Sequence, residues 1–296
     1  MTTQTHRHRV PTKPTPAAHA VRERLRELSR ELRRVIRAKR LSAKKLHDLR
    51  VACRRAEAAL RLCREVAESR AWRWLHERLR ELRRSCNPAR DDDVSRSWLK
   101  QNAADSSDEW RRDLKSHRQA AVPAIVKRAK RLAHDQRFQR QAAKIVNRLR
   151  AFESKNRAAL VFGRSLFDEV HRFVRSFPNG SDDAAAWHAL RINGKRLRYA
   201  SEIVSQIWPD VELSELREQL QTLQQQLGTV HDLQVGRQRL ESWNRNGSPR
   251  AARELFATMS DSLSKAEQSF AKWWKSCPLE RTLADTTAEV LTLIQK

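Results

Sequence analysis

Two short stretches of the sequence concentrate side chains that suit the binding of an anion. The first, LHDLRVACRR at residues 46–55, contains His47, Arg50, Arg54 and Arg55. The second, WHALRINGKRLRY at residues 187–199, contains His188, Arg191, Lys195, Arg196 and Arg198. The planar guanidinium fork of arginine donates two hydrogen bonds to a phosphate at once. Both stretches therefore indicate a ligand with several phosphates or similar anionic groups.

On a helix, with about 100° per residue, the cations of each stretch form a ridge. The first ridge occupies an arc of about 60° and consists of His47, Arg50, Arg54 and Arg61. The second ridge consists of His188, Arg191, Lys195 and Arg198. Each ridge runs beside an apolar stripe, so we expect it to line a groove between helices rather than face open solvent. Arg55 and Arg196 project elsewhere and are secondary candidates.

A solvated basic face is the alternative interpretation of such a ridge, and it describes most charge runs. Like charges at i and i+4 destabilise a helix by a few tenths of a kcal/mol per pair. Both halves contain such destabilising like-charge pairs, and few acids interrupt the ridges apart from Glu202. The binding of a ligand is therefore the better explanation of the ridges.

The whole composition agrees with an anionic partner. The 296 residues include 61 Lys and Arg against 35 Asp and Glu, a formal net charge of +26. Four kinds of anionic partner could neutralise this positive charge: nucleic acid, inorganic polyphosphate, an anionic membrane surface or an acidic protein. No run approaches the roughly 20 apolar residues of a membrane span, and no secretory signal is evident. We expect a cytoplasmic protein with a disordered basic tail at residues 1–18.

Helix-forming residues dominate, and no segment shows sustained alternation of period two, so the sequence predicts an all-α fold. The expected helices cover residues 19–39, 43–68, 71–86, 92–102, 106–132, 136–155, 160–176, 183–207, 212–228, 231–243, 249–276 and 280–295. Clear breaks occur at FPNGSDD (177–183) and NRNGSP (244–249). Pro123 should kink or interrupt its helix, and Asp91 and Ser181 are expected N-caps.

One offset relates the two halves. His47 precedes His188 by 188 − 47 = 141 residues, and Asp91 precedes Asp232 by 232 − 91 = 141. Two landmarks with one offset predict a tandem repeat of a helical unit, at about residues 19–155 and 160–296.

Other chemistries find little support in the sequence. The four cysteines lack metal-ligand or disulfide spacing, so we expect reduced, mostly buried thiols. His47 and His188 have no further ligands at suitable spacing for a metal. Asp91 and Asp232 suggest N-caps or ion-pair partners of ridge arginines rather than acid/base catalysts. Most of the nine tryptophans, such as Trp74, Trp98 and Trp187, fall at core-compatible positions. No phosphate loop or cofactor motif is present, so we expect no cofactor and no enzymatic activity.

The motifs HDLRVACRR and PARDDDV in the first half, and HALRINGKRLRYASEI and LQQQLGTVHDLQV in the second, resemble the CHAD family, the conserved-histidine α-helical domain. The resemblance covers about residues 19–296. It implies two pseudo-symmetric four-helix bundles with extra helices around a basic central groove or pore that binds inorganic polyphosphate. Family members are associated with polyphosphate granules, and some are fused to a triphosphatase-like domain, which we do not expect here because the two repeats use nearly the whole sequence.

Matched motif by motif, the resemblance implies a set of polyphosphate ligands in this chain. They are His47, Arg50, Arg54, His188, Arg191, Lys195 and Arg198, with Tyr199 as a hydroxyl donor. The halves differ where Glu57 and Ala58 stand for Arg198 and Tyr199, so we expect Glu57 to be only a salt-bridge partner. They also differ where His231 stands for Arg90, which weakens a shared role for that position and makes Arg90 a secondary candidate. We therefore predict a non-catalytic polyphosphate-binding protein that grips one chain with both ridges. A nucleic-acid-binding helical protein is the alternative, and a metal-dependent phosphohydrolase is a more distant one.

Overall fold

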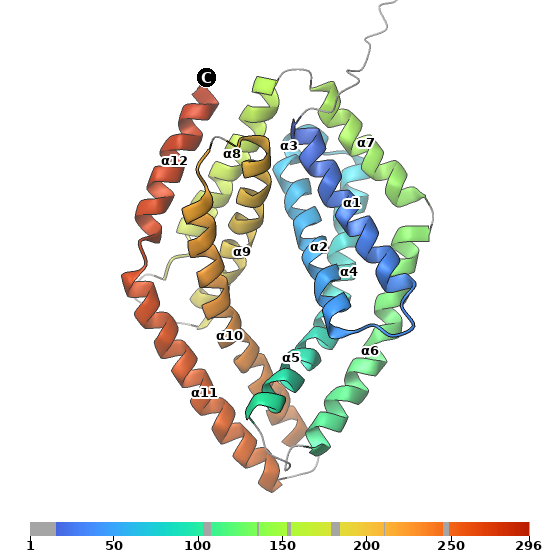
Figure 1. The fold of residues 1–296 in the computed structure, drawn as a ribbon, viewed down its shortest axis with the longest axis vertical. Helices are drawn as coiled ribbons and strands as arrows, with labels where there is room; N and C mark the ends of the chain where they lie inside the picture. Colours follow the sequence, from blue (N-terminus) through green and yellow to red (C-terminus); the bar gives the residue numbers. More distant parts are fainter. Residues whose placement is uncertain are drawn as a thin grey trace, which may run out of the picture.

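The computed structural model describes residues 16–102, 108–134, 136–152, 155–178, 184–209, 211–244 and 249–295, and within these ranges the regular structure is entirely α-helical (Figure 1). The first half contains α1 (Pro16–Ile36), α2 (Ala43–Leu62), α3 (Arg64–Ala67), α4 (Arg70–Ser85), α5 (Asn87–Asn102), α6 (Asp108–His134) and α7 (Arg137–Ala151). The second contains α8 (Lys155–Val174), α9 (Ala184–Ile207), α10 (Ser214–Asn244), α11 (Pro249–Ser276) and α12 (Leu279–Gln295). The predicted all-α class is confirmed.

Local sequence explains where these helices begin and which faces they bury. Ser42 caps α2 by accepting a hydrogen bond from the backbone N–H of Lys45 at 3.2 Å, and Ser69 caps α4 by accepting one from Trp72 at 3.3 Å. Along α4, residues at spacings of three and four are buried, including Leu75, Leu79 and Leu82. Burying each such leucine contributes about 1.5–3 kcal/mol, so this periodic face fixes the helix in the core.

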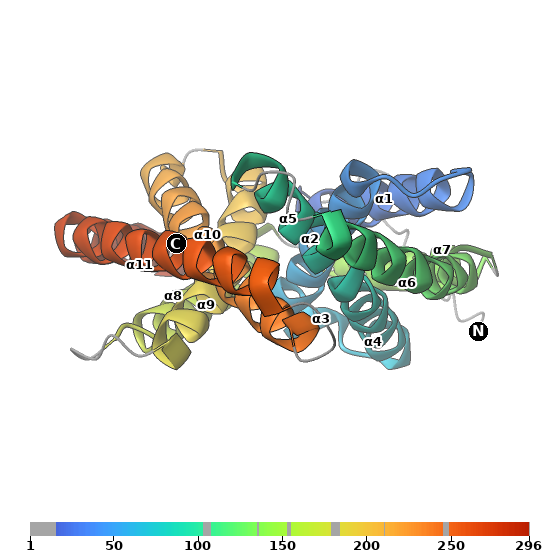
Figure 2. The same cartoon turned by 90° about the horizontal axis from the view of Figure 1, so that it is seen from below.

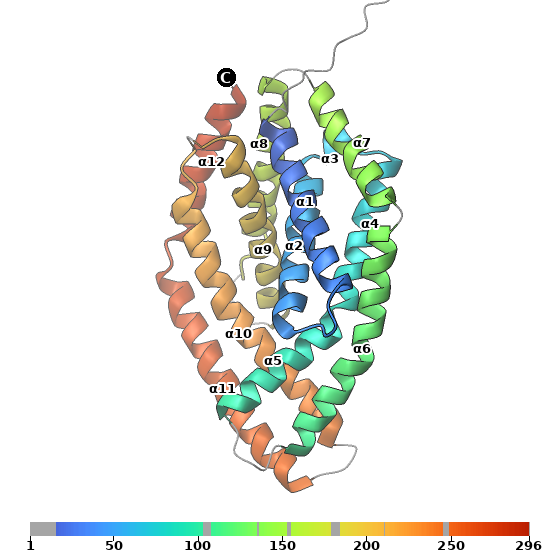
Figure 3. The same ribbon diagram turned by 45° about the vertical axis from the view of Figure 1, so that its right-hand side comes forward.

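The helices form two side-by-side groups. In the first group α2 packs on α1 and α4, while α7 packs on α1 and α4; in the second, α9 packs on α8 and α10, while α12 packs on α8. Figure 1 shows the two groups on the right and left, and Figures 2 and 3 show the same division from other sides. The groups meet where α2 packs on α9 and where α5 packs on α10. These two junctions bring the cationic stretches of both halves together.

The helix boundaries follow the offset of 141 residues. Residue 43, the start of α2, maps to 43 + 141 = 184, where α9 starts, and 108 + 141 = 249 is the start of α11. The start of α7 maps to 137 + 141 = 278, one residue from the start of α12. The long α10 takes the place of α4 and α5 together. On this correspondence we propose that residues 19–155 and 160–296 are two copies of one helical unit.

The prediction of two helices at 212–228 and 231–243 was wrong, because α10 runs without a break from Ser214 to Asn244. Its buried stripe continues on both sides of Gly228 through Leu223, Leu227, Val230 and Leu233. A glycine inside a helix costs only about 1 kcal/mol. The packing of this stripe outweighs that cost.

Other boundaries also differ from prediction. Asp91 is not an N-cap, since α5 begins four residues earlier at Asn87, next to Pro88, a residue favoured in the first helical turn. Pro123 does not interrupt α6, which runs from Asp108 to His134. A break at Cys63 divides the predicted helix 43–68 into α2 and α3. The predicted cap Ser181 lies outside the described residues.

The predicted disordered tail at residues 1–18 was too long. Residues 16–18 belong to α1, where Ala17 and Ala18 are 2% and 0% exposed, and residues 1–15 lie outside the described part of the chain. The prediction for the cysteines is confirmed: all four are free thiols, and Cys53, Cys63 and Cys86 are buried.

Candidate anion-binding site

Four helices bring the cationic residues of both halves to one place. The packing of α2 on α9 and of α5 on α10 sets the arrangement. We call the group the central basic cluster; its members are His47, Arg50 and Arg54 of α2, Arg90 of α5, His188, Arg191 and Lys195 of α9, and His231 of α10. Two acids, Asp91 of α5 and Asp232 of α10, lie among these cations, because each is close enough to cluster members to interact with their charges.

The pKa of Lys195 reflects the charges of both ridges. Burial, and then the charge of Arg191 on its own helix, lower the pKa of this ammonium group to about 6. The charges of Arg54 and Arg50, which belong to the other half, lower the pKa further, against the opposing effect of Asp232. The ridges of α2 and α9 therefore converge, as the paired-ridge hypothesis requires.

Arg50 and Arg191 occupy equivalent positions in the two halves and share the same environment. Burial lowers the pKa of each guanidinium to about 10, and the charge of Arg54 contributes in both cases. The Nη1 atom of Arg50 and the Nε atom of Arg191 are buried and lack a hydrogen-bond partner among the described residues. A buried donor without a partner costs about 1–3 kcal/mol, and more when charged. An anion between the ridges would relieve this cost.

The three histidines of the cluster are less basic than a free imidazole. Burial and the charges of Arg90, Arg50 and Arg54 lower the pKa of His47, although Asp48 opposes them. Burial, followed by the charge of Arg191, lowers the pKa of His188. Such neutral rings can each donate and accept one hydrogen bond.

His231 is the third of these histidines and the most strongly affected. Burial, then the charges of Arg191 and His188, lower its pKa to about 3. Its ring centroid lies 5.5 Å from that of His188. The two rings therefore add hydrogen-bonding capacity to the second half of the cluster rather than further charge.

The two acids are placed inside helices and not at helix starts. Asp232 lies in the middle of α10, so its predicted N-cap role is wrong, as it is for Asp91. Burial raises the pKa of Asp91, against the charges of Arg50 and Arg239. Burial also raises the pKa of Asp232, against the charges of Arg90, Lys195 and Arg191. Each acid offsets part of the local positive field without forming a direct ion pair with a cluster member.

Four of the predicted cations are instead engaged in direct ion pairs. Arg61 lies 3.6 Å and Arg196 lies 3.2 Å from the same carboxylate oxygen of Glu169 on α8. Arg198 pairs with Glu202 at 2.6 Å, and Arg55 pairs with that carboxylate at 3.3 Å. The pairs Arg61–Glu169 and Arg55–Glu202 join the two halves. Their cations already have partners, so they are less available to an external anion than those of the cluster.

Tyr199 lies with this ion-paired group and not in the central basic cluster. It is 4% exposed, and the guanidinium of Arg198 sits 4.5 Å from its ring centroid. At the position equivalent to Arg198, Glu57 accepts hydrogen bonds from Nε of Arg83 at 3.0 and 3.1 Å. The ion-pair role expected for Glu57 is thus what the structure shows.

Sequence reasoning gave too little weight to two members of the cluster. Arg90 acts on the pKa of both His47 and Asp232, and His231 stands at the equivalent position of the other half, 90 + 141 = 231. The difference between arginine and histidine was taken as a sign of unequal roles. The offset itself was the signal that both side chains enter the same site.

The described ranges also bear on the alternative chemistries. There, no group of three or more His, Cys, Asp or Glu side chains could hold a metal ion, and no helix is long and apolar enough to cross a membrane. All nine tryptophans are buried or partly buried. All of them lie in the hydrophobic core or pack against it, as their core-compatible positions predicted.

Comparison with known proteins agrees with the helical fold described above. The CHAD domain family profile matches residues 14–241, more than half of the chain. A crystal structure of the CHAD domain from the plant Ricinus communis superposes with a TM-score of 0.62 and 21% identity, covering 98% of this chain and 97% of that one. PptA from Streptomyces chartreusis gives a TM-score of 0.57 with 19% identity, covering 89% and 100%. No protein with a curated description matches. The match over residues 14–241, with the fold shared by these structures, shows that the chain belongs to the CHAD domain family.

Proposed function

We propose that this protein binds inorganic polyphosphate in the central basic cluster and does not act on it chemically. The observation that carries the proposal is that Arg50 and Arg191, from opposite halves, both act on Lys195 and Asp232, and that each has a buried guanidinium nitrogen without a partner among the described residues. Phosphate oxygens supply the acceptors that these donors lack, and a linear polyanion supplies them in series. The family resemblance supports the same ligand class.

The ion pairs divide the cationic residues into proposed polyphosphate ligands, which have no direct ion pair with a described residue, and residues with a structural role. Polyphosphate contacts the cluster members His47, Arg50, Arg54, His188, Arg191 and Lys195, together with Arg90 and His231. Arg55 and Arg61 hold the halves together through Glu202 and Glu169, and Arg196 and Arg198 pair with the same two carboxylates within the second half. Tyr199 supports Arg198. A pocket of about 450 Å³ beside the cluster, lined by Arg90, Asp232 and Trp98 among others, gives the chain a place to continue.

A titration with polyphosphates of graded length, run beside duplex DNA and RNA, tests the proposal. We expect tight binding of long polyphosphate that excess nucleic acid does not displace. The affinity should fall steeply with salt, because each neutralised phosphate releases condensed counterions. With four cluster arginines, the slope of log K against log salt should be roughly −3, from about −0.7 per contact.

Two results would contradict the proposal. Displacement of polyphosphate by RNA at equal phosphate concentration would favour a nucleic-acid-binding protein. Release of phosphate from the bound chain, dependent on an added divalent metal, would favour a phosphohydrolase. Localisation of the protein at polyphosphate granules in cells is the corresponding expectation for its biological setting.

A further inference from the structure

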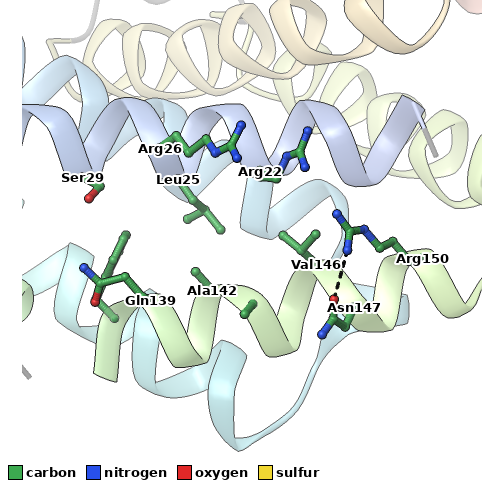
Figure 4. A pocket seen from close by; sticks show the side chains of 11 residues that line it. Arg22, Leu25, Arg26, Ser29, Gln139, Ala142, Val146, Asn147 and Arg150 are labelled. Carbon is green, nitrogen blue, oxygen red and sulfur yellow. Dashed lines mark hydrogen bonds between the residues drawn. The ribbon is translucent and has the colours of Figure 1, made fainter. Parts of the chain in front are cut away.

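A cavity of about 360 Å³ lies between α1 and α7, on helices that contribute no member of the central basic cluster (Figure 4). Its apolar lining includes Leu25 of α1 and Phe138, Ala142 and Val146 of α7. Small-molecule sites commonly have volumes of about 300–1,000 Å³ and are mostly apolar, with a few polar groups that fix orientation. The size and lining of this cavity fall within that range.

In the second half, larger side chains occupy two of the positions that line this cavity in the first half. By the offset of 141, Ser29 corresponds to Val170 and Ala142 to Leu283. Val170 and Leu283 are 4% and 3% exposed and belong to the core, whereas Ser29 and Ala142 are only partly buried. Larger apolar residues thus occupy in α8 and α12 the positions that small residues leave open in α1 and α7.

The rim of the cavity is cationic. Arg22, Arg26 and Arg150 line it, and among the described lining residues none is acidic. The Nε atoms of Arg22 and Arg150 are buried without a hydrogen-bond partner. Nε of Arg22 lies 4.0 Å from Oε1 of Glu23, which also pairs with Arg26, whereas the one side-chain partner of Arg150 among the described residues is Asn147, at 3.5 Å. In Figure 4 the guanidinium groups of Arg22 and Arg150 lie toward the same end of the cavity. Arg150 above all therefore has guanidinium donors at that end that suit a phosphate or carboxylate, beside the charge of Arg22.

From these features we infer that the cavity between α1 and α7 binds an amphiphile with an unbranched alkyl chain and an anionic headgroup. The chain lies along Leu25, Ala142 and Val146, and the headgroup lies between Arg22 and Arg150. The wall residues Leu25, Phe138 and Val146 are 3%, 2% and 5% exposed. They are too recessed to dock the broad apolar face of a helix, but a slender chain inserted between α1 and α7 reaches them.

The protein's own N-terminal segment does not suit this site. Residues 1–15, MTTQTHRHRVPTKPT, contain no acidic residue, so their charge would be repelled by the arginine rim. Both a phosphate and a carboxylate headgroup suit the arginine rim, and the experiment tests the two headgroups separately. The inference is independent of polyphosphate binding, because it uses other helices.

Calorimetry with dodecyl phosphate and with dodecanoate, each below its micelle concentration, tests the inference on the full chain. We expect one site per chain, an affinity that rises about two- to fourfold per added methylene along the alkyl series, and no binding of dodecyltrimethylammonium, which has the same chain and a cationic head. The amphiphile that binds more tightly shows which of the two headgroups the site prefers. Saturating polyphosphate should leave the binding unchanged.

Two variants locate the site. Ala142→Leu introduces the residue that the second half carries at this position, and it should weaken binding by at least about tenfold by filling the cavity. Arg150→Gln removes the headgroup partner and should weaken binding about tenfold, the loss expected for one charged hydrogen bond. The matched control is Lys144→Gln, which removes a charge from an exposed position of α7 outside the cavity and should change nothing.

Three results would overturn the inference: unchanged affinity in both Ala142→Leu and Arg150→Gln, displacement by polyphosphate, or equal binding of the cationic amphiphile. Because Arg150→Gln leaves the apolar packing intact, it decides the question even if Ala142→Leu fails to fold.

Discussion

Lys195 differs from the arginines around it because it can lose its proton near neutral pH. Its pKa is lowered to about 6 from an ordinary value of 10.5, first by burial and then by the charges of Arg191 and Arg54. At pH 8 the side chain is therefore mostly neutral in the free protein. A bound polyanion favours the charged form, so binding must take up a proton.

We predict that polyphosphate binding at pH 8 takes up about one proton per site, and that the affinity rises as the pH falls from 8 toward 6. Calorimetry in buffers of different ionisation enthalpy measures this uptake. At pH 8 the cluster histidines, whose pKa values are also lowered, remain neutral, so the uptake reports on Lys195. Lys195→Arg, which stays charged, should bind without proton uptake. Equal uptake in wild type and Lys195→Arg would contradict the assignment.

Substitution of Arg54 tests whether the cations of the first ridge bind a ligand or stabilise the fold. It makes no direct ion pair with a described residue, and its charge lowers the pKa of Arg50, Arg191 and Lys195. Arg54→Ala should weaken polyphosphate binding about tenfold, the loss of one charged hydrogen bond, and should leave the melting temperature equal or slightly higher. Lys195→Ala should do the same.

Exposed Arg84 of α4 provides the matched control for Arg54, because Arg84→Ala removes one positive charge from outside the cluster. Binding and melting temperature should both stay near the wild-type values in that variant. A fall of several degrees in Arg54→Ala and Lys195→Ala, with binding intact, would show that the ridge cations are structural.

At the scale of elements, α5 uses three consecutive aspartates for three different neighbours. Successive residues on a helix point about 100° apart. Asp91 faces the central basic cluster, Asp92 forms an ion pair with Arg239 of α10, and Asp93 forms one with Arg118 of α6. The run DDD thus fixes α5 between the two halves while it contributes one acid to the site.

Helix α9 depends on a close approach at Gly194. A Cβ atom there would lie 2.7 Å from Cδ2 of Leu223 on α10 and 3.2 Å from Cε2 of Phe173 on α8. Around Gly228, in contrast, no described atom outside its own helix backbone and its two chain neighbours lies within 4 Å of such a Cβ. The first position is packed against its neighbours, and the second is open.

We predict that Gly194→Leu lowers the free energy of unfolding by about 1–3 kcal/mol through overpacking, and weakens binding because Arg191 and Lys195 share that helix. Gly228→Leu should raise the free energy of unfolding by up to about 1 kcal/mol, since leucine is the better helix former. Urea titration of both variants measures the difference. If Gly194→Leu proved as stable as wild type, α9 would not be held by this contact.

For the whole molecule, the repeated ridge makes one long site out of two short ones. From His47 to Arg54 a ridge spans about 10 Å at 1.5 Å per residue, which reaches only a few phosphates. The facing ridge of α9 extends the contact, and engagement of the second ridge is then intramolecular.

We predict that substituting His47, Arg50 and Arg54 together by alanine weakens binding of long polyphosphate by about a hundredfold or more, although α9 is unchanged. Titration calorimetry should give one site per chain for a polyphosphate just long enough to span the cluster. Two equivalent, independent sites would mean that each half binds separately on a shared scaffold.

The sequence by itself determined the helical class, most helix positions and the paired cationic stretches. These features depend on local periodicity, and the offset of 141 between His47 and His188 is visible without coordinates. It also carried the motifs by which the family was correctly inferred. The errors at Asp91 and Asp232 arose because turn-like residues were taken as breaks where buried stripes continue across them.

Only the tertiary structure divided the cations into two groups. Arg54 and Arg61 lie on the same face of α2, yet Arg61 meets Glu169 of α8 while Arg54 meets no carboxylate among the described residues. Glu202, one of the two carboxylate partners of Arg55, and Asp92, the carboxylate partner of Arg239, are each 147 residues away from the arginine that they meet. Whether a cation is paired, buried or free depends on which distant helix packs beside it, and helical periodicity along one segment contains no information about that neighbour.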